Sequence, residues 1–513
     1  MGANLALLDW TVLVFYALLI ITIGIISGRK EKNTDDYFLA GRKMPWWAVM
    51  FSIYATSLSA LTFIGVPGAA FAGDFHYLQL GIGDFFGRIL ISFLLLTAYY
   101  RGRVTTVYEL LGQRFGVRSH SAGTYFFILT RLLASGVRLA GCAIALAVVF
   151  NIPIHLAIAL IALTALAYTL VGGIKAVIWT DMVQFFLFMA AASIAIVVIV
   201  LALPKGWTDL VSIGNIHQKF KIFHISFLSG TKDYWLDFGN PQSLMAGFLF
   251  GCFTTFAALG TDQDMVQRML TCEKVKQSQK AILWTAVLNF PITLLFLGVG
   301  AALFAYYQIF PDAQVSSFIV AKKADYVFPH FIKTVLGPGL RGILIAGLLA
   351  AAMSSLDSAL NALATTAYVD IYKKYAPSNI SDKKALKISR YLVVVFAVIL
   401  AVIAIFFSQT ESILWLGFRI AGYTYGALLG IFLLAILTKK RGSDKVNVLV
   451  MVSSIFVVIF FTAESIGPLN SIREIILRPL NVKALAWPWA IILGTLWTFF
   501  IGILFRTQNV GKK

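Results

Sequence analysis

The segment IYATSLSALT, residues 53–62, places four serine and threonine side chains inside an apolar stretch of membrane length. Pro67 and Gly68 follow one or two helical turns later. Polar side chains are costly in hydrocarbon, so a helix that meets only lipid does not usually carry them. Serine and threonine can satisfy backbone groups freed by local unwinding, which leaves main-chain carbonyls facing a cavity. The sequence therefore predicts a broken membrane span over residues 46–72.

A second span, over residues 243–265, carries the same kind of interruption. It contains Gly247, Gly251, Thr254, Thr255 and Gly260. Ordinary helix packing through small residues explains this span equally well when it is taken alone. Two interrupted spans at corresponding places in two halves, however, indicate an inverted-repeat secondary transporter with its site near the bilayer midplane.

Composition supports a polytopic helical membrane protein. The 513 residues are 59% hydrophobic and 13% charged, and apolar runs of about 20 residues recur from end to end. Hydropathy predicts thirteen spans, near residues 10–27, 46–72, 77–100, 121–150, 153–172, 177–203, 243–265, 278–308, 338–369, 384–408, 411–437, 446–463 and 487–505.

The formal net charge of +19 reflects basic loops beside a membrane and does not indicate a surface that binds nucleic acid. Lysine and arginine gather in alternate connections, including residues 29–43, 101–118, 373–390 and 439–445, while the short opposite connections carry none. Basic loops are usually cytoplasmic, so we expect a multi-pass protein of the cell membrane with its amino terminus outside and its carboxy terminus inside. The three cysteines form neither a disulfide framework nor a metal-binding pattern.

A third polar run, AAMSSLDSALN at residues 351–361, lies in the apolar span 338–369. Ser354, Ser355 and Ser358 fall on one helical face, and Asp357 lies on an adjoining stripe. Serine can simply allow close helix packing in membranes, but an intramembrane carboxylate is usually functional. Hard oxygen ligands on one face suit a hard cation such as Na⁺.

Several motifs together resemble the sodium:solute symporter family. They are TDDYFLAGR at residues 34–42, ATSLS at 55–59, GGIKAVIWTD at 172–181, DMVQR at 264–268 and MSSLDSALN at 353–361. The resemblance implies an all-α, leucine-transporter-like fold of two inverted five-helix repeats. It divides the chain into an extra first helix with a cytoplasmic loop (1–45), a first repeat (46–203), an external loop (204–242), a second repeat (243–440) and two additional helices (441–513).

The resemblance also implies cation sites. The first Na⁺ would lie between the broken span 46–72 and the span 338–369. Its ligands would be the backbone carbonyls of Ala55, Leu58 and Ala351 and the hydroxyls of Ser354 and Ser355. One Na⁺ is therefore expected, and a second is possible.

The bacterial sialic acid transporters of this family imply the second site, at Asp181, Ser354, Asp357 and Ser358. Asp357 replaces a serine of the family pattern, so it could strengthen Na⁺ binding, carry a proton or pair with an arginine. Asp181 could instead merely cap its helix.

The solute site is less defined. Hydroxyl and aromatic side chains on the two broken spans suit a small polar organic solute. The candidate residues are Ser57, Ser59, Thr62, Gln79, Arg138, Phe248, Phe250 and Thr254. Arg131 and Arg138 share one helical face, and a buried arginine can hold a carboxylate with two hydrogen bonds. We favour Arg138, although pairing with Asp84 or another carboxylate is an equal alternative, and Asp84 and Arg88 are expected to form an internal ion pair.

These observations favour Na⁺-coupled uptake of a small organic solute by alternating access, with an organic anion such as sialic acid or a monocarboxylate as first choice. A neutral sugar is the alternative. The sequence shows no repeated filter motif, which argues against a channel, and no attached signalling domain, which argues against a sensor. The six histidines are scattered rather than gathered with carboxylates, so no enzyme is expected. The expected partners are the solute, Na⁺ and the lipid bilayer, with no nucleic acid and no obligate protein partner.

Overall fold

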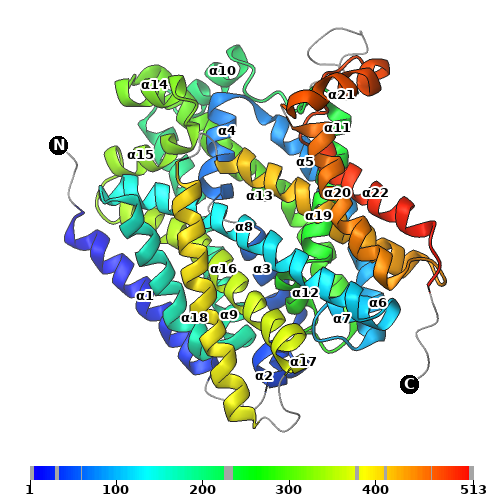
Figure 1. The fold of residues 1–513 in the computed structure, drawn as a ribbon. Helices are drawn as coiled ribbons and strands as arrows, with labels where there is room; N and C mark the ends of the chain where they lie inside the picture. Colours follow the sequence, from blue (N-terminus) through cyan, green and yellow to red (C-terminus); the bar gives the residue numbers. More distant parts are fainter. Residues whose placement is uncertain are drawn as a thin grey trace.

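The structure is a computed structural model, and it describes residues 5–28, 34–58, 61–223, 235–375, 381–409, 413–463 and 465–507. The described residues form helices and connections, with no strand among them (Figure 1). The α-helices are α1 Leu7–Gly28, α2 Thr34–Leu39, α3 Trp46–Ser57, α4 Val66–Ala72, α5 Leu78–Leu90, α6 Leu96–Gly102, α7 Tyr108–Arg114, α8 Val117–Phe150, α9 Ile154–Ala202, α10 Trp207–Ile216, α11 Leu244–Gly260, α12 Gln263–Met269, α13 Val275–Ile309, α14 Ala313–Val320, α15 Val327–Thr334, α16 Leu340–Thr366, α17 Lys373–Tyr375, α18 Asp382–Phe407, α19 Ile413–Leu437, α20 Asp444–Thr462, α21 Asn470–Leu477 and α22 Trp489–Ile503.

Shorter helical segments join several of these helices. Three have π-helical hydrogen bonding, η2 Leu61–Gly65, η4 Ile91–Leu95 and η6 Ala367–Tyr372. Five are 3₁₀ turns, η1 Ala40–Arg42, η3 Phe75–Tyr77, η5 Ala324–Tyr326, η7 Gly467–Leu469 and η8 Arg478–Leu480. Short π segments inside α-helices often mark functional sites, and η2 lies in the first span that the sequence predicts to be broken.

The length and apolar composition of the helices fit a multi-pass membrane protein. Within the described ranges, nine helices are long and apolar enough to cross a membrane, and two bent pairs would raise that number to eleven. Two shorter apolar helices, residues 154–167 and 489–503, correspond to two further predicted spans. The total of thirteen spans depends on those short helices and stays a prediction.

Both expected breaks are present. Residues 46–57 and 62–72 are bent by 62°, and α11 and α12 are bent by 68°. At the first break, Leu58 has an extended backbone with φ −83° and ψ 96°. At the second, Asp262 is extended and its side chain accepts a hydrogen bond from the amide of Asp264, which caps the start of α12. Each break therefore ends a helix where its last carbonyls lose their helical partners.

A third interruption, in α9, divides two predicted spans. Gly173 has φ 49° and ψ −165°, a conformation that glycine adopts more readily than any residue with a Cβ atom. The second half of this helix carries Asp181 and packs against both α3 and α16. The kink thus sets the direction of the segment that faces both walls of the first predicted cation site.

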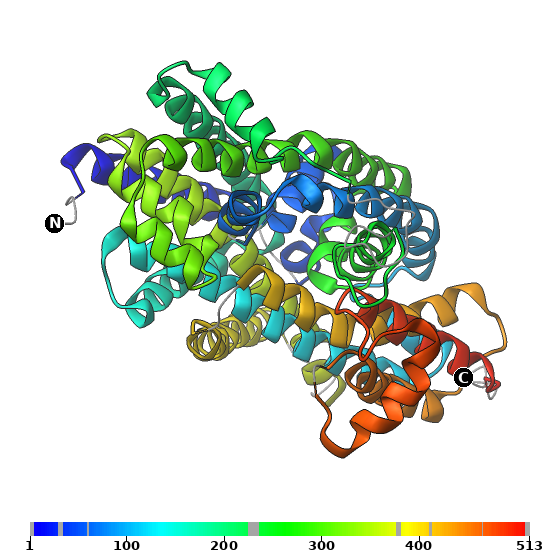
Figure 2. The ribbon, with the colours of Figure 1, turned by 90° about the horizontal axis from the view of Figure 1, so that it is seen from above.

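Close helix contacts hold the broken spans in place. A Cβ atom at Gly83 of α5 would lie 1.9 Å from the carbonyl oxygen of Phe248 in α11, so these two helices touch backbone to backbone. Seen from above, the C-terminal helices α20 and α22 gather at one edge of the molecule, opposite the amino terminus (Figure 2). Helix α11 contacts α5 as well as α19 and α22, whereas α12 packs against α3 and α16.

Candidate functional site

The break after α3 lies against the polar face of α16. The Ser354 hydroxyl donates to the carbonyl oxygen of Ala55 at 3.0 Å and lies 3.4 Å from that of Ala351. The Ser355 hydroxyl lies 3.3 Å from the same Ala351 carbonyl. All these residues, and Leu58 at the break, are buried. The structure therefore brings four of the five residues expected at the first Na⁺ site into contact, and the fifth, Leu58, lies one turn after Ala55 at the break.

These oxygens have the chemistry of a Na⁺ site. They are uncharged hydroxyl and carbonyl groups, and helix ends with free carbonyls commonly coordinate the coupling ions of transporters. In the structure the two serine hydroxyls satisfy the carbonyls by hydrogen bonding. A bound cation would accept electron pairs from the same oxygens, with the hydroxyl protons turned away.

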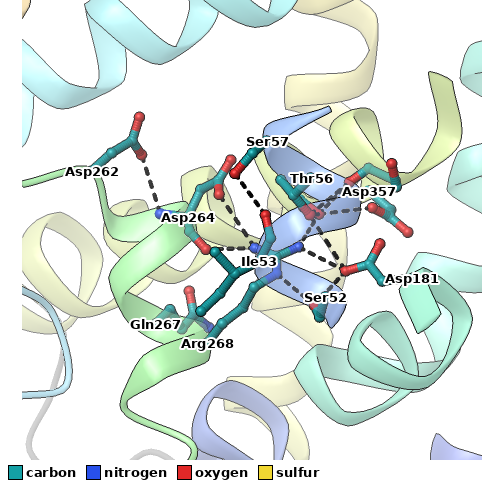
Figure 3. A network of polar contacts seen from close by, with 12 residues as sticks. Ser52, Ile53, Thr56, Ser57, Asp181, Asp262, Asp264, Gln267, Arg268 and Asp357 are labelled. Atoms are coloured by element: carbon teal, nitrogen blue, oxygen red, sulfur yellow. Dashed lines mark hydrogen bonds and ion pairs between the residues drawn. The ribbon is translucent and has the colours of Figure 1, made fainter. Parts of the chain in front are cut away.

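Asp181 is surrounded by donors from two other helices. It accepts hydrogen bonds from Ser52 at 2.6 Å and from Thr56 at 3.4 Å, both on α3. The guanidinium group of Arg268, on α12, lies 3.1 Å from its Oδ2 atom. Figure 3 shows Arg268 reaching toward α3 and Asp181. Asp181 lies inside α9, so it does not cap a helix end.

Asp357 and Ser358 lie beside this pair. The Ser358 hydroxyl is 3.0 Å from Asp357 Oδ1 and 3.3 Å from the Thr56 hydroxyl, and it contacts Arg268. The residues expected at the second cation site are therefore brought together, with an arginine among them.

A buried charge network continues from Arg268 to α8. Arg268 also pairs with Asp264 at 3.2 Å, and Arg131 contacts both Asp264 and Asp262, the latter at 3.1 Å. The Tyr425 hydroxyl donates to Asp262 at 2.5 Å. All these charged side chains are at most 1% exposed. Charges this deep persist because each is paired and hydrogen-bonded.

A central pocket of about 180 Å³ adjoins the first cation site. Leu58 and Ser57 of the broken span line it, as do Arg138 and Thr254. The buried Nη1 atom of Arg138 has no hydrogen-bond partner among the described residues, and the same holds for the Thr254 hydroxyl. Arg131 lines the pocket too, but its guanidinium is held by Asp262 and Asp264. Arg138 thus remains the arginine open to a solute.

An ion pair forms another part of the pocket wall. Arg88 Nε lies 2.8 Å from Asp84 Oδ2, which confirms the expected pair on α5. The Thr255 hydroxyl donates to Asp84 Oδ1 at 2.5 Å, and Arg88 donates to Thr285 at 2.6 Å. Asp84 therefore pairs with Arg88 rather than with Arg138.

Aromatic side chains lie between the central pocket and a wider vestibule of about 830 Å³. Tyr77, Phe250 and Phe418 line the pocket, whereas Trp487 lines the vestibule. The Phe418 ring lies 6.4 Å from Tyr77, 5.4 Å from Phe250 and 5.9 Å from Trp487, measured between ring centres. Close aromatic contacts of this kind are stable but can rearrange by rotation of side chains.

The other solute candidates are divided among several places. Ser57, Thr62, Phe250, Thr254 and Arg138 line the central pocket. Gln79 lines the vestibule instead, where it donates to the carbonyl of Ile222. Phe248 packs on Phe86, with ring centres 5.6 Å apart, and lines neither cavity. Ser59 lies outside the described residues.

The charge network was not expected as a unit. The i, i+4 spacing of Asp264 and Arg268 inside an apolar region was the available signal. Asp262 and Tyr425 carried no such local signal, because their partners lie more than a hundred residues away in sequence. Asn289 was also missed, and it lines the pocket while accepting from the Tyr54 hydroxyl at 2.9 Å.

Comparison with known proteins identifies the family of this chain. The model of the sodium:solute symporter family matches residues 37–445, which is more than half of the chain. The chain belongs to the sodium:solute symporter family. It is 32% identical over 443 residues to the sodium/sialic acid symporter NanT of Aliivibrio fischeri, covering 85% of this chain and 84% of that protein. This family transports solutes with Na⁺, so the chain is a Na⁺-coupled symporter and not an enzyme.

Two solved structures agree on the fold of this symporter. One is a Na⁺-coupled sialic acid symporter in a substrate-bound, outward-open state, described with a novel Na⁺ site. It has a TM-score of 0.81 and 25% identity, and covers 97% of both chains. The other is the nucleobase-cation-symport-1 transporter Mhp1 in a closed conformation, with a TM-score of 0.50, 13% identity, and coverage of 92% of this chain and 94% of that one. The all-α, leucine-transporter-like fold is confirmed.

Proposed function

We propose that this symporter takes up a small organic anion, whose carboxylate binds Arg138. One observation carries the proposal: the buried Nη1 atom of Arg138 lacks a hydrogen-bond partner among the described residues and borders the central pocket. A buried unpaired donor is costly, and a carboxylate supplies the missing acceptor and a compensating charge. The sodium/sialic acid relatives move an organic anion, which supports the same class here.

The first Na⁺ is proposed to bind the oxygens of Ala55, Leu58, Ala351, Ser354 and Ser355. The hydrogen bond that joins Ser354 to Ala55 supports this assignment, because it already links the two helices that would share the ion. Leu58 and Ser57 border the solute pocket. Ion and solute would then order the same break in the helix, so each would raise the affinity for the other.

A second cation is proposed beside Asp181, Asp357 and Ser358. Asp181 Oδ1 is buried and has no hydrogen-bond partner among the described residues, although Oδ2 is paired with Arg268. The balance of buried charges also supports two bound Na⁺ ions in total. Four buried carboxylates, those of Asp181, Asp262, Asp264 and Asp357, lie in the region that holds the guanidinium groups of Arg131 and Arg268, and Arg138 lines the adjoining pocket.

A bound anion would raise the excess of negative charge in this region to two, if all four carboxylates are ionised. Uncompensated buried charge is strongly unfavourable. Two Na⁺ ions would cancel the excess, with one at each proposed site. The ion pair between Asp84 and Arg88 cancels internally and does not change the balance.

Transport would follow by alternating access. The broken helices α3, α4, α11 and α12 would move with α5 and α13 against a scaffold that includes α8, α9 and α16. Ala55 and Arg268 lie on the moving part, whereas Ser354 and Asp181 lie on the scaffold, so both proposed cation sites bridge the two. The basic connections support an outside amino terminus and a cytoplasmic carboxy terminus, and no obligate protein partner is proposed.

Arg138 variants test the anion proposal. Arg138→Ala should abolish Na⁺-driven uptake of organic anions, and Arg138→Lys should keep a weaker uptake because lysine retains the charge without the planar fork. Na⁺ binding by the purified variants, measured by Na⁺-dependent thermal stabilisation, controls for folding. Uptake of a neutral sugar that is unaffected in Arg138→Ala would contradict the proposal and favour the sugar alternative.

A further inference from the structure

The strap, residues 103–107, joins α6 to α7 at the end of the molecule away from the vestibule. Gln79 lines the vestibule, Arg88 lines the central pocket, and Gly102 ends α6, so the run from α5 through α6 leads past the pocket to the strap. At about 1.5 Å per residue this run spans roughly 35 Å. Figure 1 shows α6 and α7 near α12 in the lower part of the molecule, and α10 and α14 at its top.

Gln263, the first residue of α12, binds the strap through both ends of its side-chain amide. Its Nε2 atom donates to the carbonyl of Thr105 at 3.0 Å, and its Oε1 atom accepts from the backbone amide of Val107 at 2.9 Å. Gln263 and Val107 are fully buried, so water cannot easily replace these bonds. Separating the two would leave buried polar groups without partners, which is costly. Gln263 therefore fastens α12 to the strap at two points.

The strap is also bound to the scaffold helices. The Thr106 hydroxyl donates to Asp370 Oδ1 at 2.8 Å, and Asp370 lies in η6, which continues α16. The Nε2 atom of His120, on α8, lies 2.9 Å from the same oxygen, and the Thr124 hydroxyl, also on α8, lies 3.4 Å from Asp370 Oδ2. Thr106 and Asp370 are buried. The strap thus joins the half-helix α12 to both α8 and α16.

Helix α12 lies between the central pocket and the strap. Met265 of α12 lines the pocket, two residues after Gln263. Gln267 of the same helix donates to the Thr365 hydroxyl of α16 at 3.3 Å. In the proposed alternating-access movement, α12 has to separate from α8 and α16 to open a path from the pocket on this side. The strap stands across that separation, because it is hydrogen-bonded to both parts.

Tyrosine hydroxyls strengthen the same attachment. A helix that ends at a break leaves its last carbonyls without helical partners. At the second break, the Tyr99 hydroxyl of α6 donates to the carbonyl of Gly260 at 2.6 Å, and the Tyr108 hydroxyl of α7 donates to that of Thr261 at 3.0 Å. Both tyrosines are fully buried. The second break is therefore held against α6 and α7 by donors of the protein itself.

We propose that the strap is a latch that keeps the pocket closed on the side away from the vestibule, with Gln263 as its release point. The proposal rests on the proposed alternating access and assigns the residues that hold one of its two gates. It follows from one buried segment being bonded both to the moving α12 and, through Thr106, to Asp370 on the scaffold. Gln263 is a positioning residue, because it acts through the strap. Weakening either attachment should favour the state that is open on the strap side.

Gln263→Met tests the latch with little change in side-chain size. Methionine offers no N–H donor and only a weak acceptor, so the bonds to Thr105 and Val107 are lost. Gln113→Met is the matched control. Gln113 is exposed on α7 and donates to the carbonyl of Gly102 at 3.2 Å, which does not join the strap to α12.

Two cysteine reporters follow the two ends of the molecule. Thr365→Cys replaces a fully buried residue between α12 and α16, and Ala69→Cys places a thiol on the vestibule wall. The native cysteines are first replaced by alanine; they are Cys142, Cys252 and Cys272. The rate of labelling by a water-soluble maleimide is measured on the purified full-length protein. K⁺ replaces Na⁺, because Na⁺ bound between α3 and α16 would oppose the same movement.

Gln263→Met should raise the labelling rate of Thr365→Cys about tenfold, the effect of about one lost hydrogen bond, and leave that of Ala69→Cys unchanged or lower. Thr106→Val, which releases the strap from the scaffold, should act in the same direction. Gln113→Met should change neither rate. A rise at both reporters would show general loosening and would overturn the latch. Unchanged labelling of Thr365→Cys in both strap variants would overturn it as well.

Na⁺ distinguishes failure of the latch from failure of the transport cycle. With the strap intact, adding Na⁺ should slow the labelling of Thr365→Cys and speed that of Ala69→Cys, because the ion bridges the moving part and the scaffold. If Na⁺ has this effect and the strap variants have none, the latch is wrong and alternating access stands. If Na⁺ changes neither reporter, alternating access by this movement fails, and the latch fails with it.

Discussion

The guanidinium group of Arg268 lies 3.1 Å from the carboxylate of Asp181, and neither side chain is exposed. This ion pair joins the half-helix α12, which follows the second break, to α9. It also borders Ser358, next to the first cation site. Arg268 and the proposed second cation therefore share the carboxylate of Asp181. Arg268 pairs with Oδ2, and Oδ1 is left for the ion.

Removing Arg268 should destabilise the protein strongly. Arg268→Met leaves Asp181 and Asp264 without their shared cation, and loss of one partner of a buried pair typically costs about 3–5 kcal/mol. Thermal unfolding of the purified protein in detergent measures the effect. The exposed Arg101 supplies the control, because Arg101→Met should leave the melting temperature within about 1 °C of wild type. Equal stability of the two variants would contradict a structural role for the network.

Ser354→Ala should weaken Na⁺ dependence without unfolding the protein. The hydroxyl is the described link between α16 and the carbonyl of Ala55, and losing one ligand at about 1.4 kcal/mol raises the half-saturating Na⁺ concentration about tenfold. Na⁺-dependent uptake kinetics provide the measurement. Ser317, exposed on α14, provides the matched control. A normal Na⁺ dependence in Ser354→Ala would remove this residue from the site.

The number of Na⁺ ions can be tested at Asp181 and Asp357. Asp181→Asn or Asp357→Ala should lower the Hill coefficient for Na⁺ from a value above one toward one, because each variant removes a ligand from the second site alone. Initial uptake rates over a range of Na⁺ concentrations give the coefficient. If both variants keep the wild-type coefficient, the second site does not exist.

Lys219, which lies outside the membrane spans, should make the stability of the protein depend on pH. Burial lowers the pKa of Lys219 to about 8 from its ordinary value of 10.5, with the carboxylate of Asp74 opposing the shift. Between these values the unfolded chain binds the proton that the folded protein releases. The free energy of unfolding therefore rises with pH across this window.

The measurement compares variants across that window. The Lys219 ammonium donates to the carbonyls of Phe71 and Gly73, each at 2.7 Å, so it holds the end of α4. Lys219→Met should lose the rise in stability between about pH 8 and pH 10, whereas the exposed Lys205→Met should keep it. Parallel curves for Lys219→Met and wild type would show that Lys219 does not titrate in this range.

Much of the fold could be predicted because membrane helices are constrained locally. Hydrocarbon excludes unsatisfied backbone groups, so the hydroxyls of residues 53–62 and the run at 351–361 marked the break and the polar helix face without any knowledge of contacts. The five residues of the first site belong to these two segments. Their meeting followed from the resemblance to a family, and the structure shows the hydrogen bond between Ser354 and Ala55.

The remaining site residues could not be placed from the sequence. Their positions depend on how each helix is rotated about its axis and on partners far away in sequence, and hydrophobic periodicity determines neither. Gln79 lies on the vestibule side of α5, and Phe248 turns toward Phe86, although both belong to helices that border the pocket. The choice between Arg131 and Arg138 could not be made from their shared face. It required the position of Asp262 and Asp264, more than 120 residues away in sequence, which hold Arg131 and leave Arg138 facing the pocket.

Uptake by purified protein in proteoliposomes tests the central claim most directly. Accumulation of a radiolabelled organic anion would be measured with an inward Na⁺ gradient, with equal Na⁺ on both sides, and with K⁺ replacing Na⁺. The account predicts accumulation above equilibrium with the gradient alone, a further increase when the interior is negative, and a need for about tenfold more Na⁺ in Ser354→Ala. Uptake that proceeds equally in K⁺ would contradict Na⁺ coupling through the site between α3 and α16.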